Sequence, residues 1–92
     1  QALSGLWSLN GYPGQTPVKM GTIISDLVGG LFGIIGIVGA YHYAQKTGKG
    51  QLVDVAQLDA SLAVTGYAIP KYTAGGIISE CAGNEDAIAY PF

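Results

Sequence analysis

The sequence predicts an α/β fold on the strength of three consecutive features. Residues 27–45 carry no formal charge and are rich in glycine and apolar residues, a pattern that favours a long helix. A glycine-containing turn, 47–50, and a short run rich in β-branched residues, 51–55, follow it. A second helical pattern begins at Gln57. Helix, tight turn, strand and helix in this order are typical of an α/β domain with a parallel sheet.

Residues 1–22 are expected to form a loop that is held by apolar anchors. Asn10-Gly11 and Pro13-Gly14 are turn-forming pairs. The expected anchors are Leu3, Leu6, Trp7 and Leu9. A single tryptophan usually packs against other apolar groups, so Trp7 is interpreted as a packing residue rather than a binding one.

Ser25 and Asp26 stand at the start of the long helix, which is predicted over residues 23–47. Ser25 is expected to be the N-cap, because its hydroxyl can accept a hydrogen bond from the unpaired backbone N–H groups of the first turn. Asp26 then lies in that turn, where the helix dipole favours a negative side chain. Gly29 and Gly30 leave space for a ligand or another backbone. By spacing alone, Asp26 is either an ordinary first-turn acid or a reactive group.

One face of the predicted long helix carries only small side chains. The small residues recur at steps of four, three, four and four: Gly29, Gly33, Gly36, Ala40 and Ala44. Such a face lets another backbone approach closely, both in membrane helix pairs and in tightly packed soluble cores. The five glycines of the helix cost about 4 to 5 kcal/mol relative to alanine, so the helix needs close packing to be stable. Asp26 and Tyr41-His42-Tyr43 leave an apolar part of only about fourteen residues, which favours a buried core helix over a membrane span.

The long helix is expected to end in the turn at 47–50, where Gly48 suits a left-handed conformation. The spacing of this turn does not fit a phosphate-binding loop, and the turn follows a helix instead of opening one. The second helix is predicted over 57–69, with Pro70 as its terminator. Residues 70–92 are expected to form an irregular tail.

Composition argues against several classes of function. The net charge is −2 and the four lysines are scattered, so there is no basic patch for nucleic acid. Cys81 stands alone, which excludes a disulfide framework and a cysteine metal site, and it is interpreted as a structural thiol. His42 is interpreted as a residue that interacts with the helix dipole, with a ligand or a general base as the alternative. No secretory signal pattern is present, so a reducing, cytoplasmic setting is expected.

The balance of apolar and charged residues indicates that the chain is covered by something else. Apolar residues make up 49% of the sequence and charged residues 11%, which is a low charged fraction for a free-standing domain of 92 residues. The cover could be further chain, a second copy or a membrane. The chain is therefore interpreted as a segment of a longer protein.

Four stretches, taken together, resemble the class III CoA-transferases. They are Gln1–Gly11, the Ser25-Asp26 helix start, Lys46–Ala60 and Gly83–Phe92. This family contains formyl-CoA and carnitine CoA-transferases and the related α-methylacyl-CoA racemases. The run Thr47-Gly48-Lys49-Gly50-Gln51-Leu52-Val53-Asp54-Val55 is its most specific part, whereas Ala89-Tyr90-Pro91 departs from the usual order. The resemblance covers nearly the whole chain but only a middle portion of a family member.

The resemblance implies a fold and a chemistry. Residues 1–92 would be a single partial domain, a fragment of the large Rossmann-like domain of a class III CoA-transferase. Asp26 would be the nucleophile that moves CoA between carboxylic acids through an aspartyl covalent intermediate. Ser25, Gly29 and Gly30 would lie near the substrate and the oxyanion. The implied partners are an acyl-CoA and a carboxylic acid acceptor, with a coenzyme A thioester as substrate, no permanently bound cofactor, no metal, and an interlocked homodimer as the assembly.

Two alternatives stay open on the sequence. In the racemase branch an Asp acts as an acid/base with an upstream His, to which His42 does not correspond. A non-enzymatic module could use Gly29, Gly33 and Gly36 for helix dimerisation or membrane association. No residue specifies the donor or acceptor acid. By itself the 92-residue chain is expected to hold the nucleophile without a complete site, and so to be inactive.

Overall fold

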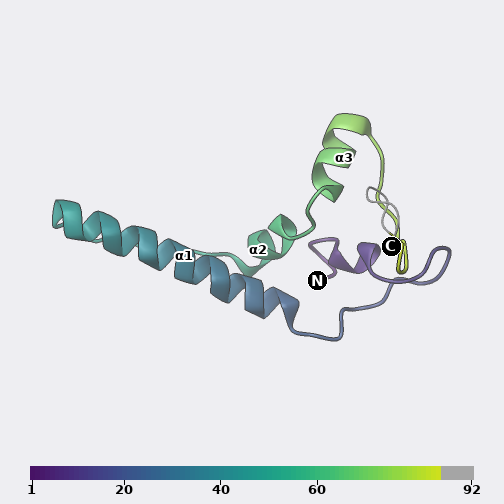
Figure 1. Cartoon of the computed structure of the whole chain (residues 1–92), viewed down its shortest axis with the longest axis horizontal. Coiled ribbons are helices and arrows are strands. Elements are labelled where there is room, and N and C mark those ends of the chain that lie inside the picture. Colours follow the sequence, from purple (N-terminus) through teal and green to yellow (C-terminus); the bar gives the residue numbers. More distant parts are fainter. Residues whose placement is uncertain (86–92) are drawn as a thin grey trace.

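The structure is a computed structural model of the 92-residue chain, and it describes residues 1–85. A short 3₁₀ helix, η1 (Leu6–Leu9), is followed by three α-helices, α1 (Ile24–Thr47), α2 (Gln57–Ala63) and α3 (Ala68–Gly75). Figure 1 shows α1 as a long rod, with α2 beside its N-terminal half and with η1 and α3 beyond that end. The helix α1 packs chiefly against α2.

The chain does not enclose a core of its own. Its extents are 55 × 28 × 25 Å and its radius of gyration is 17.0 Å, whereas a compact domain of this length has a radius of gyration of about 12 Å. It exposes 6898 Å² of surface, against about 5,000 Å² for a compact monomer of this mass. The buried apolar residues of the described part are Leu6, Val28, Ala60 and Cys81. Much of the apolar surface is therefore available to further chain or to a partner.

The long helix spans Ile24–Thr47, close to the range expected from the sequence. The prediction that Ser25 is the N-cap is wrong: Ile23 occupies the cap position without a side-chain cap hydrogen bond, and Ser25 lies inside the first turn. Asp26 is in that turn, as expected. At the other end Gly48 adopts a left-handed conformation, with φ 71°, and its N–H donates to Ala44 O at 2.8 Å.

On α1 the face of small residues is the less exposed one, and the bulky residues on the other faces are exposed. Between Val28 and Thr47, the residues that are not exposed are Val28 itself and the five small residues of the predicted face: Gly29, Gly33, Gly36, Ala40 and Ala44. Leu31 and Ile35 on the other faces are 58% and 66% exposed. The helix is long and apolar enough to cross a membrane by length and composition, a test that core helices of soluble proteins also pass.

Part of the small-residue face is covered by the chain's own return segment, residues 49–57. A Cβ placed on Gly36 would lie 2.6 Å from Val53 Cγ1, and one placed on Gly29 would lie 3.7 Å from Gln57 Cγ. The sequence suggested that absent chain or a partner would cover this face, and at these two positions the same chain covers it instead. A Cβ at position 36 would therefore require Val53 to turn or the return segment to shift.

The predicted strand at 51–55 is not formed, and the described residues contain no β-strand. Residues 51–56 run without regular structure, and Leu52 is 90% exposed. A strand must pair its backbone groups with a neighbouring strand, and residues 1–85 offer none to 51–55. The part of the chain that the structure describes is therefore helical, and the parallel sheet expected for an α/β fold is not made within it.

The predicted second helix is two helices, α2 and α3. The break lies near Gly66, whose φ of +61° is left-handed and interrupts a helix. Pro70 was expected to end the helix, but it lies in the first turn of α3, where its missing N–H leaves no hydrogen bond unmade. The expectation of an irregular tail from residue 70 is wrong as far as Gly75, where α3 ends. The departure from the family pattern at Ala89-Tyr90-Pro91 lies outside the described residues.

The N-terminal loop is fastened to the approach to α1 through Gln1. Its side-chain amide donates to Thr22 O at 3.3 Å, and its side-chain oxygen accepts from the Met20 N–H at 3.1 Å. Of the expected anchors, Leu6 is buried, but Leu3 is 91% exposed and does not act as one in this chain. The two hydrogen bonds bring the start of the chain beside the first turn of α1.

Candidate active site

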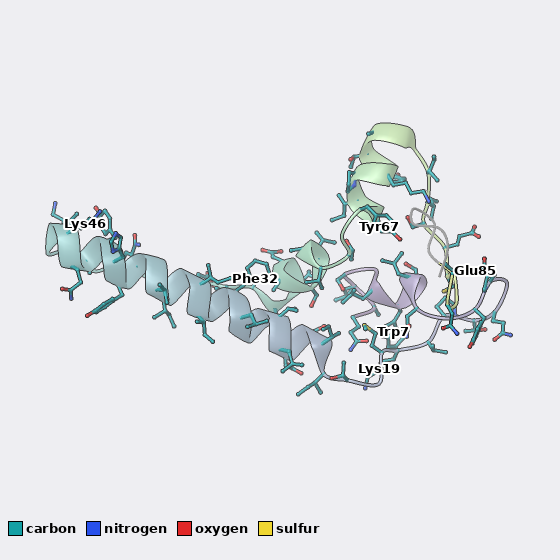
Figure 2. All side chains as sticks on the ribbon, viewed as in Figure 1. Trp7, Lys19, Phe32, Lys46, Tyr67 and Glu85 are labelled. Atoms are coloured by element: carbon teal, nitrogen blue, oxygen red, sulfur yellow. The ribbon has the colours of Figure 1, made fainter. Side chains whose placement is uncertain are left out.

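Asp26 lines a cavity between the start of α1, the N-terminal loop and α2. The cavity has a volume of about 540 Å³, which is within the range of small-molecule sites. Its lining residues are Gln1, Ala2, Leu3, Trp7, Lys19, Ile23, Ser25, Asp26, Gln57, Leu58 and Ser61. Figure 2 shows Trp7 and Lys19 in the N-terminal part of the chain, beyond the first turn of α1. Trp7 is 40% exposed and lines this cavity, so its ring is only partly packed.

The carboxylate of Asp26 is exposed and is held on one side. Asp26 Oδ1 accepts a hydrogen bond from Gln57 Nε2. An ionised carboxylate can only accept hydrogen bonds, so the amide nitrogen of Gln57, and not its oxygen, must face it. The other carboxylate oxygen, Oδ2, is not held by Gln57.

Gln57 is the residue of this site that the sequence did not reveal. It is the first residue of α2, and its main-chain oxygen accepts from Ser61 Oγ at 2.8 Å. Its side chain passes beside Gly29, one helical turn after Asp26. Asp26 and Gln57 are 31 positions apart in the sequence, so the contact cannot be read from local spacing. The only signals were the small-residue face and the expected helix start at Gln57.

The structure brings together two of the four predicted site residues. Ser25 and Asp26 both line the cavity, and Ser25 Oγ is buried without a hydrogen-bond partner in the described part of the chain. Gly29 and Gly30 are not among the lining residues. The space at Gly29 is bounded by Gln57, and nothing lies within 4 Å of a Cβ placed on Gly30. Gly29 therefore faces another part of this chain, the Gln57 side chain, and not the cavity.

Neither His42 nor Cys81 lines the cavity at Asp26. His42 is exposed and follows Asp26 by sixteen residues on the same helix, a separation of about 24 Å at 1.5 Å per residue. Cys81 is buried, and its thiol donates to Ser8 O at 3.3 Å, an arrangement that suits a structural thiol. Within residues 1–85 no group of three or more His, Cys, Asp or Glu side chains is placed to hold a metal ion.

Comparison with known proteins identifies relatives of the whole chain. The chain is 42% identical over 91 residues to the alpha subunit of succinyl-CoA–L-malate CoA-transferase from Chloroflexus aurantiacus, covering 98% of this chain and 21% of that protein. It is 37% identical over 93 residues to acetyl-CoA:oxalate CoA-transferase from Acetobacter aceti, covering 100% of this chain and 24% of that protein. The chain thus spans between a fifth and a quarter of the length of these relatives.

A solved structure and a family model agree with these relatives. The crystal structure of a CAIB/BAIF family protein from Brucella suis superposes with a TM-score of 0.87 at 33% identity, over 91% of this chain and 22% of that one. The model of CoA-transferase family III matches residues 1–92. The resemblance seen in the sequence is confirmed, and the chain belongs to CoA-transferase family III.

Proposed function

We propose that this chain carries the nucleophilic part of an acyl-CoA:carboxylate CoA-transferase, with Asp26 as the residue that becomes covalently modified. The observation that carries the proposal is the position of Asp26. Its exposed carboxylate lines a cavity of about 540 Å³ at the start of α1, and Gln57 holds one of its two oxygens. A nucleophile needs this combination of access to substrate and a fixed orientation.

The first half of the reaction loads CoA onto the protein. Asp26 Oδ2 attacks the thioester carbonyl of the acyl-CoA, and collapse of the tetrahedral adduct expels the CoA thiolate and leaves a mixed anhydride. The thiolate then attacks Asp26 Cγ and expels the donor acid as its carboxylate. The product is an aspartyl-CoA thioester. Covalent catalysis of this kind replaces one difficult transfer by easier steps.

The second half repeats these steps with the acceptor acid. Its carboxylate attacks Asp26 Cγ and expels the CoA thiolate, which gives a second mixed anhydride. The thiolate attacks the acceptor's carbonyl carbon, so that the new acyl-CoA leaves and the Asp26 carboxylate is restored. No proton is gained or lost in the cycle, so the reaction needs no general base.

A dicarboxylic acid is the substrate class that the cavity best suits. Lys19 lines the same cavity as Asp26. Its ammonium group can pair with the second carboxylate of an acid whose first carboxylate reacts at Asp26. The names of the relatives from Chloroflexus aurantiacus and Acetobacter aceti include succinyl-CoA, malate and oxalate, which derive from dicarboxylic acids, beside acetyl-CoA, which derives from a monocarboxylic acid.

The proposed site includes chain beyond these 92 residues. The excess exposed surface and the exposed bulky face of α1 support a cover made by the rest of the protein or by a second copy in a homodimer. A coenzyme A thioester enters this assembly as a substrate. We propose a cytoplasmic location, in keeping with the lone thiol of Cys81.

Trapping with hydroxylamine tests the proposal. The full-length protein is incubated with succinyl-CoA without an acceptor, hydroxylamine is added, and the peptide that contains Asp26 is analysed by mass spectrometry. We expect a hydroxamate on Asp26 that Asp26→Asn abolishes. Asp59→Asn is the matched control, because Asp59 is also an acid in the first turn of a helix but does not line this cavity. Exchange of CoA between acids without a hydroxamate on Asp26 would refute the proposal.

Deuterium exchange separates the transferase from a racemase. A racemase removes the proton at the α-carbon of a 2-methylacyl-CoA, so it incorporates deuterium from heavy water without any acceptor acid. The transferase cycle above leaves the α-carbon untouched. We expect no deuterium in the recovered acyl-CoA, and its incorporation at the rate of turnover would favour the racemase.

A further inference from the structure

The hydrogen bond between Gln57 and Asp26 joins two separate elements of the structure. Asp26 lies in the first turn of α1, and Gln57 is the first residue of α2. The donor is Gln57 Nε2 and the acceptor is Asp26 Oδ1. The two residues also line the same cavity. The donor therefore reaches the carboxylate at the place where substrate would react.

Gln57 is placed by the start of α2, and its side chain lies beside Gly29 of α1. Its main-chain oxygen accepts from Ser61 Oγ at 2.8 Å, within α2. The Cγ of Gln57 lies 3.7 Å from the point that a Cβ on Gly29 would occupy, an ordinary van der Waals distance. The aliphatic part of the side chain therefore lies beside α1. The amide group is thus directed to Asp26 from a fixed neighbouring helix rather than from a free side chain.

We propose that Gln57 is a further catalytic residue, which donates a hydrogen bond to the oxyanion that forms on Asp26 Oδ1. The inference rests on the proposed function of Asp26 as the nucleophile. In the anhydride, Oδ2 is the bridging oxygen and Oδ1 is the carbonyl oxygen. When the CoA thiolate bonds to Cγ, the electron pair of the Cγ–Oδ1 double bond moves to Oδ1. When that pair returns, the Cγ–Oδ2 bond breaks and the donor acid leaves with Oδ2. Attack by the acceptor carboxylate on the thioester places the same charge on Oδ1.

The charge on Oδ1 changes in a way that makes this donor catalytic. The carbonyl oxygen of the anhydride or thioester is neutral, and the oxygen of the tetrahedral adduct carries a full negative charge. A hydrogen bond to a charged acceptor is stronger than one to a neutral acceptor. Gln57 therefore stabilises each transition state at Cγ more than the covalent state that precedes it, and only such a difference raises the rate.

The inference predicts which steps depend on Gln57. Attack on Asp26 Cγ produces the oxyanion on Oδ1, whereas attack on the carbonyl carbon of the donor acid produces an oxyanion on the substrate. Gln57 contacts Asp26, so loss of its donor slows the steps at Cγ. Hydroxylamine distinguishes the two carbons, because attack at Cγ gives a hydroxamate on the protein and attack on the donor carbon of the anhydride gives the free acyl hydroxamate.

Gln57→Met is the informative variant, since methionine keeps the length and the aliphatic contact but has no N–H. Gln45→Met is the matched control, because Gln45 is exposed near the far end of α1 and does not line the cavity. Full-length variants are mixed with succinyl-CoA and hydroxylamine, and both hydroxamates are measured over time. The non-enzymatic background is measured with Asp26→Asn and subtracted. Thermal unfolding of each variant reports on folding.

With Gln57→Met we expect formation of the Asp26 hydroxamate to slow about 10²-fold, the usual cost of one oxyanion donor. The free acyl hydroxamate is expected to become the larger share of the products, because the anhydride persists. Gln45→Met should form both hydroxamates at the same rates as the wild-type protein. Gln57→Leu also has no donor and adds no charge beside Asp26, and the same shift in products is expected, so this variant keeps the inference testable if Gln57→Met does not fold.

Three results would overturn the inference. Unchanged rates of hydroxamate formation in Gln57→Met would show that the donor is not used. The proposed function would still stand in that case if the wild-type protein formed a hydroxamate on Asp26. An equal fall in both hydroxamates would show a purely structural role for Gln57. Absence of any Asp26 hydroxamate in the unmodified protein would refute the proposed function, and the inference with it.

Discussion

Adding a single methyl group at Gly36 tests how the return segment is held against α1. A Cβ at this position would lie 2.6 Å from Val53 Cγ1 and 3.9 Å from Val53 Cβ. Carbon atoms that are not bonded make their best contact at about 3.5 to 4.0 Å. In Gly36→Ala, either Val53 must turn about its χ1 angle or residues 49–57 must move away from α1.

Two opposing contributions determine the size of the effect. Alanine in place of glycine inside a helix stabilises it by about 1 kcal/mol. An extra methyl group in a filled space destabilises by about 1 to 3 kcal/mol. The net change for Gly36→Ala alone therefore lies between zero and about 2 kcal/mol of destabilisation and mixes the two contributions, so the contact must be isolated by a second substitution. Val53→Ala removes the methyl groups that the new Cβ would meet.

A double-mutant cycle of unfolding free energies in the full-length protein provides the assay. We expect Gly36→Ala and Val53→Ala to couple by about 1 to 3 kcal/mol, with the double variant more stable than the sum of the single changes predicts. Gly39→Ala is the matched control, because it lies on the same helix and nothing is within 4 Å of a Cβ placed there. Its cycle with Val53→Ala should be additive.

The coupling would refute the reasoning if it were absent. Distant substitutions add within about 0.5 kcal/mol, so a Gly36 and Val53 cycle that is additive within this margin would mean that the Val53 side chain is not held against α1 at Gly36. A coupling of equal size at Gly39 would mean that the effect comes from the helix as a whole.

Two further predictions concern substrate choice and the end of α1. Lys19→Gln is expected to raise the KM for malate about five-fold in steady-state assays, the equivalent of about 1 kcal/mol for an exposed charge pair. The KM for acetate should stay unchanged. Lys46→Gln, in the last turn of α1, is the control and should change neither KM. Gly48→Ala should destabilise the protein by about 1 kcal/mol or more in denaturant titrations, because its φ of 71° is strained for residues with a Cβ. Gly50→Ala should be nearly neutral, because Gly50 has no such φ and a Cβ placed there would have nothing within 4 Å.

The sequence predicted α1 well because its limits depend on local chemistry. A run without charge and a glycine suited to the left-handed C-terminal position identify the helix to within a residue. The same reasoning misplaced the cap by two residues, since a serine near a helix start can lie at the cap or inside the first turn. It also assigned Pro70 to the end of a helix, although proline is equally at home in the first turn.

The errors at residues 51–55 and at Gln57 have a different cause, because both depend on contacts with other parts of the protein. The β-branched residues at 51–55 favour a strand, but a strand exists only where a neighbour supplies hydrogen bonds, and residues 1–85 provide none. Asp26 was found through its position in a family pattern. Gln57 was missed because its contact with Asp26 depends on how α2 packs on α1, and a helix start carries no mark of what its first side chain touches.

The small-residue face of α1 connects the packing of the helix to the chemistry proposed for it. Helices with ordinary side chains at their contact pack with axes about 8 to 10 Å apart. At Gly36 the return segment occupies space that a Cβ would need, with Val53 Cγ1 2.6 Å from the Cβ position, and Gln57 lies beside Gly29. A Gln side chain is short, so a wider separation would withdraw its amide from Asp26. The close contact at Gly36 therefore also helps to hold Gln57, the proposed hydrogen-bond donor, within reach of the proposed nucleophile.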